Sequence, residues 1–209
     1  MNYLYAPWRS GYFSGKSQEC VFCAISQGIN LCENTIKTQE NWLPKEARIK
    51  EVKEFAIPFN HGDFTQSDFA NRVFYRDEKV FCVMNKFPYT PGHFLVIPHL
   101  HTHSPELLDM EVWLHLQKIA YQGVALLKEF GAQGINLGMN IERAGGAGIP
   151  EHLHLHLIPR FIGDTNFFTT IGDSRAYGVD FDAIFARICA LAQTYFKDFS
   201  RESQRRKNG

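Results

Sequence analysis

The sequence has no excess of charge of either sign. Lysine and arginine together number 22 among the 209 residues, and aspartate and glutamate also number 22. Proteins that bind nucleic acid or an anionic membrane surface over a broad area usually carry a basic excess. We therefore expect neither partner, and any anionic ligand is expected to be small and locally bound.

Long apolar runs are also missing. No stretch approaches the roughly 20 apolar residues of a membrane-spanning helix. The first 15 residues are rich in aromatic side chains and lack the apolar run of a secretion signal. These two absences predict a cytoplasmic protein.

Cysteines are few and odd in number, which does not suit a disulfide framework. Two of the five lie in apolar surroundings, where a thiol usually acts as a small hydrophobic side chain, and two others are spaced as Cys-x-x-Cys. That pair could be redox-active, metal-binding or incidental. The five are Cys20, Cys23, Cys32, Cys82 and Cys189.

What is present is the composition of a globular protein, with 44% hydrophobic and 14% aromatic residues. The length suits one domain with an extension. We divide the chain into residues 1–69, with an N-terminal arm, the Cys-x-x-Cys segment and an insertion, a domain at 70–200, and a solvated basic tail at 201–209. The arm either packs onto the body or is a mobile terminus.

Alternation and apolar runs predict two hairpins. Val80–Met84 is predicted to be a buried strand, and His93–Pro98 its antiparallel partner across a proline-containing turn. Ile135–Ile141 and His152–Ile158 are expected to pair across the glycine-rich turn Glu142–Gly148.

Apolar residues at helical spacing predict two long helices. The first covers Met110–Phe130 and ends at Gly131, and the second covers Phe181–Tyr195. Helices that pack against an antiparallel sheet make an α+β domain.

Histidine and leucine alternate strictly from His152 to Leu157. Successive side chains of a strand point to opposite sides, so the three imidazoles are expected to share one face. The outer two would lie roughly 13 Å apart at the backbone, too far for one metal ion to bind all three rings at about 2.0–2.1 Å. At least one histidine is therefore left for another role.

The segment His152–Arg160, with the sequence His-Leu-His-Leu-His-Leu-Ile-Pro-Arg, resembles the signature of the histidine triad (HIT) family of nucleotide hydrolases and transferases. Asn85–Pro98 resembles the hairpin that precedes this signature in the family. The resemblance extends over about residues 73–166. It implies an antiparallel sheet of about five strands with helices packed against it.

The resemblance implies that His154 is the nucleophile. It would attack the α-phosphorus of a nucleotide and form a covalent nucleotidyl-histidine, while His156 donates a hydrogen bond to a phosphate oxygen or to the leaving group. The chemistry agrees, because an imidazole with a pKa near 6.5 is largely neutral at pH 7 and attacks without a separate base.

The glycine-rich loop before the triad can present backbone N–H groups to a phosphate. The resemblance assigns substrate contacts to Gly146, Ala147, Gly148 and Ile149. The common hydrolases carry a glutamine and a hydroxyl residue where this chain has Gly148 and Ile149. We therefore expect the loop to contact the phosphate through its main chain and not through side chains.

Two asparagines also align with family positions that contact the ligand. Asn85 aligns with the ribose-binding residue, although it could equally cap its turn. Asn140 aligns with a polar residue near the phosphates, and an amide in an apolar strand needs a partner.

Zinc-containing relatives use a Cys-x-x-Cys pair, a histidine after the first hairpin and the first triad histidine. The matching residues are Cys20, Cys23, His101 and His152, which would form a closed structural zinc site. His99 and His103 are rival ligands. No organic cofactor is expected.

Other segments bear on the acceptor. Four segments together are similar to bacterial diadenosine tetraphosphate phosphorylase-like members of the family: Leu4–Arg9, the Asn85–His93 hairpin, Gly145–Ile149 and Gly163–Phe167. A histidine at the third triad place favours the hydrolase-like branches, so both water and phosphate stay open as acceptors, with water favoured.

We therefore expect a HIT-type enzyme that cleaves dinucleoside polyphosphates or related nucleotide conjugates. By resemblance it is expected to be a homodimer. Two alternatives are a metal-dependent enzyme that uses the alternating histidines as ligands, and a zinc-stabilised nucleotide-binding protein without catalysis. The many short strands of a cupin-like barrel, which the first alternative would need, are absent from the pattern.

Overall fold

The structure is a computed structural model that describes residues 20–31, 65–172 and 180–196. The predicted arm, most of the predicted insertion and the basic tail lie outside the described residues. The division of the chain into parts therefore stays a prediction.

The centre of the fold is a five-stranded antiparallel sheet with the strand order β1-β2-β3-β5-β4. This confirms the expected α+β architecture. The strands are β1 (Val73–Arg76), β2 (Val80–Met84), β3 (Phe94–Pro98), β4 (Gly134–Met139) and β5 (Leu155–Arg160).

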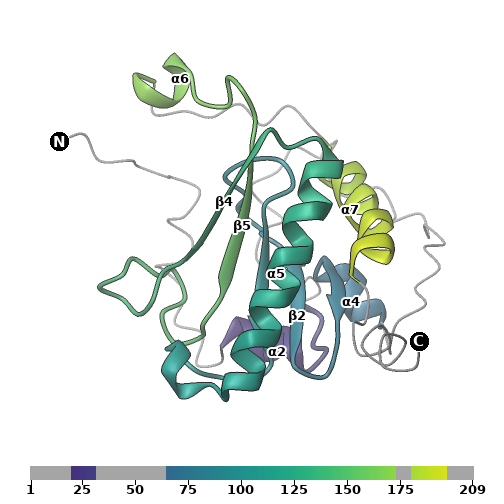
Figure 1. Ribbon diagram of the computed structural model, residues 1–209, viewed down its shortest axis with the longest axis vertical. Coiled ribbons are helices and arrows are strands. Elements are labelled where there is room, and N and C mark those ends of the chain that lie inside the picture. The colour runs from purple at the N-terminus through teal and green to yellow at the C-terminus, as the bar shows by residue number, and fades with distance from the viewer. Residues whose placement is uncertain (1–19, 32–64, 173–179, 197–209) are drawn as a thin grey trace, which may run out of the picture.

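Helices cover both faces of the sheet (Figure 1). One face packs against the long helix α5, with α7 beside it, and the opposite face carries the short helix α2 near the start of the described chain. The helices are α2 (Val21–Ser26), α4 (Gln66–Ala70), the 3-10 helix η3 (Pro105–Leu107), α5 (Met110–Phe130), α6 (Phe167–Thr170) and α7 (Phe181–Tyr195).

The long periodic elements lie where the sequence predicts them. The bounds of β2, α5 and α7 match the predicted ranges, and both predicted hairpins are present. Gly131 ends α5 with φ +113°, and its N–H bonds to the carbonyl of Lys128 at 3.0 Å. The strand β1 and the four short helices were not predicted.

The prediction that His152–Ile158 forms one strand is wrong at its start. β5 begins at Leu155, and the backbone N–H of Leu153 donates instead to the carbonyl of Thr102 at 2.6 Å. The reason lies in the neighbouring strands, because β4 ends at Met139 opposite Leu155 and the pairing with β3 stops at Val96, also opposite Leu155. Only His156 of the triad is a strand residue.

Alternation along β5 still separates an apolar face from a histidine face. Leu155 and Leu157 belong to the core cluster beneath α5. His156 lies on the opposite side, in register with Leu95 of β3, which belongs to the cluster beneath α2. The triad therefore faces the α2 side of the sheet.

The described cysteines in apolar surroundings are core residues. Cys82 and Cys189 are fully buried among aliphatic and aromatic side chains. Burial raises the pKa of the Cys189 thiol to about 12, which keeps it protonated and inert at neutral pH.

None of the helices within the described ranges has both the length and the apolar character that crossing a membrane requires.

Gly123 sets how closely α5 approaches the strand that carries the histidines. A Cβ at this position would lie 2.6 Å from Leu157 Cδ2 and 2.9 Å from Phe94 Cζ. We expect Gly123→Val to lower the free energy of unfolding by roughly 1–3 kcal/mol, because the added methyl groups overpack the helix–sheet interface. Urea denaturation of the wild type and the variant measures the change.

Glu129→Val is the matched control, because Glu129 is an exposed residue of the same helix. Its effect should stay within about 0.5 kcal/mol, as is usual for surface positions. A Gly123→Val protein as stable as the wild type would show that the interface has room for a larger side chain.

Candidate active site

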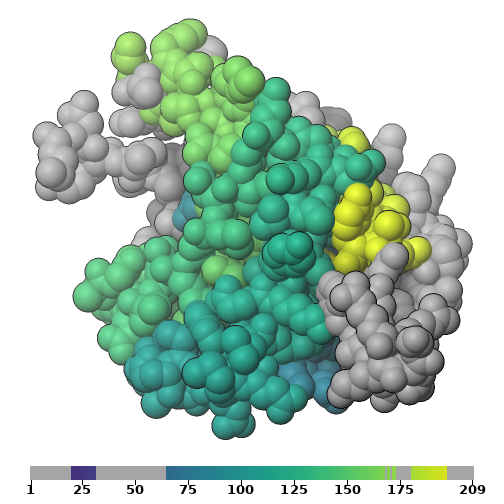
Figure 2. Space-filling model, viewed as in Figure 1, coloured from purple at the N-terminus to yellow at the C-terminus, as the bar shows by residue number. Residues whose placement is uncertain are grey.

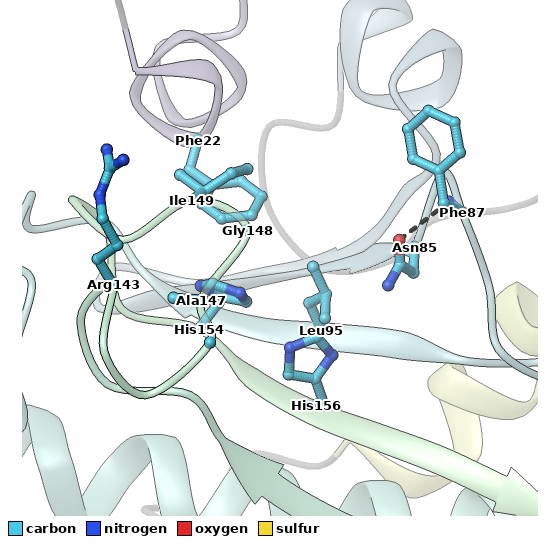
Figure 3. A pocket seen from close by; sticks show the side chains of 11 residues that line it. Phe22, Asn85, Phe87, Leu95, Arg143, Ala147, Gly148, Ile149, His154 and His156 are labelled. Carbon is cyan, nitrogen blue, oxygen red and sulfur yellow. Dashed lines mark hydrogen bonds between the residues drawn. The ribbon is translucent and has the colours of Figure 1, made fainter. Parts of the chain in front are cut away.

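A pocket of about 280 Å³ opens on the α2 side of the sheet (Figure 3). It brings together α2, the turn after β2, the strand β3, the β4–β5 loop and the last two triad histidines. Its walls are formed by Phe22, Asn85, Phe87, Leu95, Arg143, Gly146, Ala147, Gly148, Ile149, His154 and His156.

The hydrogen bond of His154 determines which of its nitrogens is nucleophilic. Its Nδ1 lies 2.8 Å from the backbone carbonyl of His152. A carbonyl oxygen only accepts hydrogen bonds, so Nδ1 carries the proton of the neutral ring. Nε2 then keeps its lone pair, on a ring that lines the pocket.

A second chain of hydrogen bonds assigns the opposite tautomer to His156. The backbone N–H of Tyr89 donates to Nδ1 of His93 at 3.1 Å, so the neutral His93 ring carries its proton on Nε2. That Nε2 lies 3.0 Å from Nδ1 of His156 and donates to it. His156 therefore carries its own proton on Nε2 and can donate it to a ligand.

His93 was not singled out as a site residue from the sequence. It stands as the first residue of the predicted strand, yet it is fully buried. The signal was an imidazole at the head of an otherwise apolar run, because a buried polar ring needs a hydrogen-bond partner.

The β4–β5 loop is wound tightly by its own backbone. Gly146 has φ +86° and donates its N–H to the carbonyl of Arg143 at 3.0 Å, and Ala147 donates to the carbonyl of Glu142 at 3.2 Å. A Cβ on Gly145 would lie 2.2 Å from the carbonyl oxygen of Ile141. Only glycine fits at that position.

Two later residues of the same loop leave backbone donors at the pocket wall. Within the described ranges, the N–H groups of Gly148 and Ile149 have no hydrogen-bond acceptor, and both residues line the pocket. Two adjacent N–H groups beside a histidine pair suit an anionic oxygen. The prediction that Gly146, Ala147, Gly148 and Ile149 contact the substrate stays a prediction.

Asn85 lies in the pocket wall and also holds its own turn. Its side-chain Oδ1 accepts the N–H of Phe87 at 3.0 Å, and its Nδ2 is 3.3 Å from Nε2 of His93. Both readings of Asn85 from the sequence are therefore compatible with its position. Asn140 follows β4 and is not among the described residues that line the pocket.

Four wall residues were missed from the sequence: Phe22, Phe87, Leu95 and Arg143. Leu95 could have been found, because the predicted pairing of two strands brings it opposite His156. No local pattern marks Phe22, which stands about 130 positions before the triad and reaches it only through the tertiary fold.

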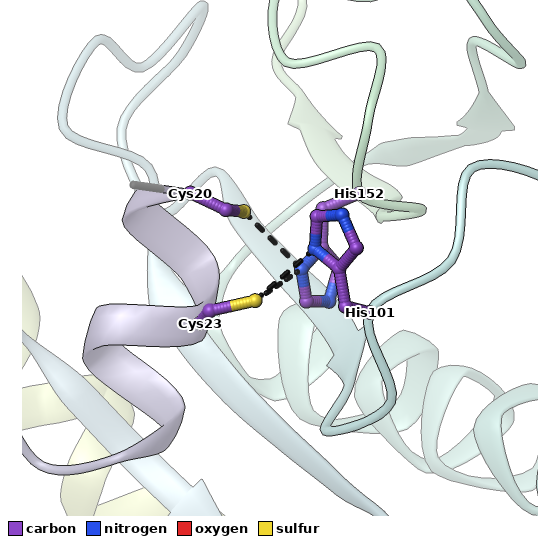
Figure 4. Close-up of side chains that lie close together, drawn as sticks. All are labelled: Cys20, Cys23, His101 and His152. Atoms are coloured by element: carbon purple, nitrogen blue, oxygen red, sulfur yellow. Dashed lines mark hydrogen bonds between the residues drawn. The ribbon is translucent and has the colours of Figure 1, made fainter. Parts of the chain in front are cut away.

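A separate cluster joins Cys20, Cys23, His101 and His152 (Figure 4). One possible ligand atom from each residue lies within 4.8 Å of the other three. The sulfur of Cys20 is 3.4 Å from Nδ1 of His152, and the sulfur of Cys23 is 3.1 Å from Nδ1 of His101. Tetrahedral zinc places such atoms roughly 3.3–3.8 Å apart, close to the observed separations.

The His152 ring has the form that a metal ligand needs. Its Nε2 donates to the carbonyl of Pro98 at 2.9 Å, so Nδ1 presents its lone pair to the two sulfurs. Burial lowers the pKa of His152 to about 4, which keeps the ring neutral at pH 7.

The two cysteines need a cation to become thiolates. Burial, with the neighbouring Cys20 adding to it, raises the pKa of Cys23 to about 11. A closely held divalent ion reverses this preference, because it stabilises the negative sulfur.

The rival histidines have other partners. The ring of His99 uses Nδ1 with the hydroxyl of Ser26 at 2.7 Å and Nε2 with the carbonyl of Asp77 at 2.9 Å. His103 is exposed and lies 3.6 Å from the carboxylate of Glu142. The structure thus brings together the four ligands proposed from the sequence.

Phe22 connects the cluster with the pocket. It stands between the two cysteines in α2, and its ring centroid lies 5.5 Å from that of His152 and 5.2 Å from that of His154. The same side chain therefore touches a candidate metal ligand and the candidate nucleophile.

Comparisons with known proteins agree with this arrangement. The family model of the HIT domain matches residues 66–163. The chain is 36% identical over 111 residues to the AP-4-A phosphorylase of Mycobacterium tuberculosis, and this match covers 52% of the chain and 56% of that protein. The chain thus spans little more than half the length of that curated relative.

Two further matches are a curated relative and a solved structure. An uncharacterized HIT-like protein of Methanocaldococcus jannaschii is 32% identical over 93 residues, which are 44% of this chain and 71% of that protein. The crystal structure of a zinc-bound histidine triad family protein from Mycobacterium smegmatis matches with a TM-score of 0.56 at 24% identity. That match covers 85% of this chain and 96% of the other, and it shows a shared fold. From its fold, its triad and these matches, the chain belongs to the HIT family.

Proposed function

We propose that the protein is a nucleotide hydrolase or nucleotidyltransferase that cleaves dinucleoside polyphosphates, or related nucleotide conjugates, at the α-phosphate. The observation that carries this proposal is the hydrogen bond from Nδ1 of His154 to the carbonyl of His152, at 2.8 Å. Because Nδ1 carries the proton, the nucleophilic lone pair is on Nε2 of a ring that lines the pocket. The AP-4-A phosphorylase name of the mycobacterial relative supports the substrate class.

In the first step, Nε2 of His154 forms a bond to the α-phosphorus while the bond to the leaving oxygen breaks. His156 donates a hydrogen bond from its Nε2 to that oxygen, which leaves as an anion. The N–H groups of Gly148 and Ile149 stabilise the negative non-bridging oxygens, so positioning and charge stabilisation lower the barrier.

In the second step, an acceptor attacks the same phosphorus and releases His154. The bond between Nε2 and phosphorus breaks, which returns the lone pair to His154, and the proton of an attacking water leaves to solvent. We favour water as the acceptor because the chain keeps the third histidine, whereas the name of the mycobacterial relative supports phosphate.

The Cys20, Cys23, His101 and His152 cluster is proposed to hold a structural zinc ion. Four protein ligands close the coordination shell and leave no position for substrate. Bound zinc would stabilise the contact of α2 with the sheet. The nucleotide chemistry is left to the chain's own residues.

The two competing functions receive less support. A catalytic ion on the alternating histidines would need an unprotonated nitrogen on each of two neighbouring rings. Nδ1 of His154 and Nδ1 of His156 are engaged in hydrogen bonds and Nε2 of His156 carries a proton, so of these two rings only His154 has a nitrogen to offer. A nucleotide-binding protein without catalysis would not need the paired and opposite tautomers of these two rings.

A homodimer is also part of the proposal. The strand β4 is an edge strand of the described sheet and exposes Leu137, and the helix α5 exposes Leu114 and Tyr121. Apolar side chains beside an open sheet edge suit a protein partner. The cytoplasmic location stays a prediction.

The nucleophile is tested by trapping the intermediate. After incubation with α-labelled diadenosine tetraphosphate and an alkaline quench, we expect label on wild-type protein and none on His154→Asn. The rate constant should fall by roughly a thousandfold or more, because the amide cannot form the covalent intermediate. His115→Gln, on the helix behind the sheet, is the control and should keep the label.

The products identify the acceptor. Attack at the α-phosphorus releases ATP, and the labelled half leaves as AMP with water or as ADP with phosphate. Turnover by His154→Asn at the wild-type rate would show that the nucleotidyl-histidine mechanism is wrong. The same conclusion would follow if both proteins bind AMP and neither turns over substrate.

His93 is proposed as a positioning residue that acts through His156. We expect His93→Asn to lower kcat for diadenosine tetraphosphate by roughly tenfold to a hundredfold, because His156 loses the donor that orients its proton. His93→Gln, whose longer amide can still donate to Nδ1 of His156, should recover part of the lost rate. Equal losses in His93→Asn and His93→Gln would indicate a purely structural role.

Metal content tests the zinc proposal. We expect about one zinc per chain by atomic emission, and Cys23→Ser should lose the metal and lower Tm by roughly 5–10 °C or more. Cys189→Ala is the control, since it removes a buried thiol far from the cluster in sequence and should destabilise the protein with its zinc retained. A metal-free wild type with unchanged Tm after chelation would contradict the proposal.

A further inference from the structure

The pocket wall contains a single permanently charged side chain, Arg143, among the residues that the structure describes. None of the described residues that line the pocket carries a carboxylate. The side chain of Arg143 is exposed and forms no ion pair within the described ranges. The neighbouring acid Glu142 is directed elsewhere, because its carboxylate lies 3.6 Å from His103.

The backbone holds this arginine at the pocket mouth. Its carbonyl accepts the N–H of Gly146, and the preceding residue Glu142 adopts a left-handed conformation with φ +58°. The backbone at Gly145 also lies so close to that of Ile141 that no side chain would fit between them. The loop backbone thus fixes the Cα of Arg143, while its exposed side chain can reach a ligand in the pocket.

Arg143 lies at the opposite end of the pocket from the turn after β2. In Figure 3 the two histidines His154 and His156 separate Arg143 on one side from Asn85 and Phe87 on the other. If the nucleoside occupies the end with Asn85, the chain of phosphates beyond the attacked phosphorus must run toward Arg143.

We propose that Arg143 binds the phosphates of the leaving half, and so selects substrates that carry at least one further phosphate beyond the phosphorus that His154 attacks. This inference rests on the proposed function and extends it to the leaving group. The α-phosphate is already served by the N–H groups of Gly148 and Ile149 and by His156.

The charges of the substrate explain why a cation is needed there. A polyphosphate bridge carries about one negative charge for each phosphate, and the neutral histidines and backbone N–H groups add no full positive charge. A guanidinium can bind two phosphate oxygens at once through its planar donors. Its attraction grows as the leaving oxygen gains charge in the transition state.

The experiment compares two substrates that share the adenylyl group and differ in leaving-group charge. Diadenosine tetraphosphate releases ATP, and the p-nitrophenyl ester of AMP releases a leaving group without phosphate. We expect Arg143→Gln to lower kcat/KM for the tetraphosphate by roughly tenfold to a hundredfold. The loss for the ester should be at least tenfold smaller.

Two further variants serve as controls. Arg143→Lys keeps the charge without the planar fork and should fall between the wild type and Arg143→Gln. Arg187→Gln removes an exposed arginine of α7, whose guanidinium lies 5.1 Å from the centroid of the Phe130 ring, and should stay within about twofold of the wild type on both substrates. Added salt should weaken the wild-type reaction with the tetraphosphate more than that of Arg143→Gln.

Equal losses on both substrates would overturn the inference, because Arg143 would then serve the α-phosphate or the fold. No loss on the tetraphosphate would overturn it as well. If the wild type turns over neither substrate, the proposed function fails, and calorimetry with ATP and AMP still tests the inference. A preference for ATP that Arg143→Gln removes supports it, and a preference that survives contradicts it.

Discussion

The structure of the candidate site depends on one hydrogen bond, from Nδ1 of His154 to the backbone carbonyl of His152. This bond forms because the chain joins the sheet only at Leu155, so the carbonyl of His152 is not used in strand pairing. It fixes the tautomer and leaves the unprotonated nitrogen, Nε2, on a ring that lines the pocket. A strand that began at His152, as the alternation suggests, would give this carbonyl to the ladder instead.

The same residue links the pocket with the cysteine cluster. The side chain of His152 faces Cys20 and Cys23, and its backbone orients the candidate nucleophile. The helix α2 adds a second link through Phe22, whose ring lies against both histidines. The site is therefore built from segments at opposite ends of the sequence, held in contact where β3 ends and before β5 begins.

The sequence was enough to predict the elements that have a local pattern. It was not enough for features that depend on contacts between distant segments. Strong periodicity was enough for β2 and α5, and the spacing of cysteines and histidines was enough to name the four cluster residues. The pocket wall formed by Phe22 could not be predicted, because no short-range pattern reports which distant segments meet. Arg143 stands in the predicted glycine-rich turn itself and was overlooked because its charge was not weighed there. The start of β5 was missed because strand pairing depends on where the neighbouring strand stops.

The loop before the triad shows how such a site could diverge while its chemistry persists. A side chain at Gly145 would collide with the backbone, whereas a Cβ at Gly148 would meet nothing within 4 Å. Replacement at the second position therefore adds a new group to the cavity without moving the amide, and replacement at the first reshapes the loop. Searches for distant relatives would gain more from the spacing of obligatory glycines than from the identity of the residues that project between them.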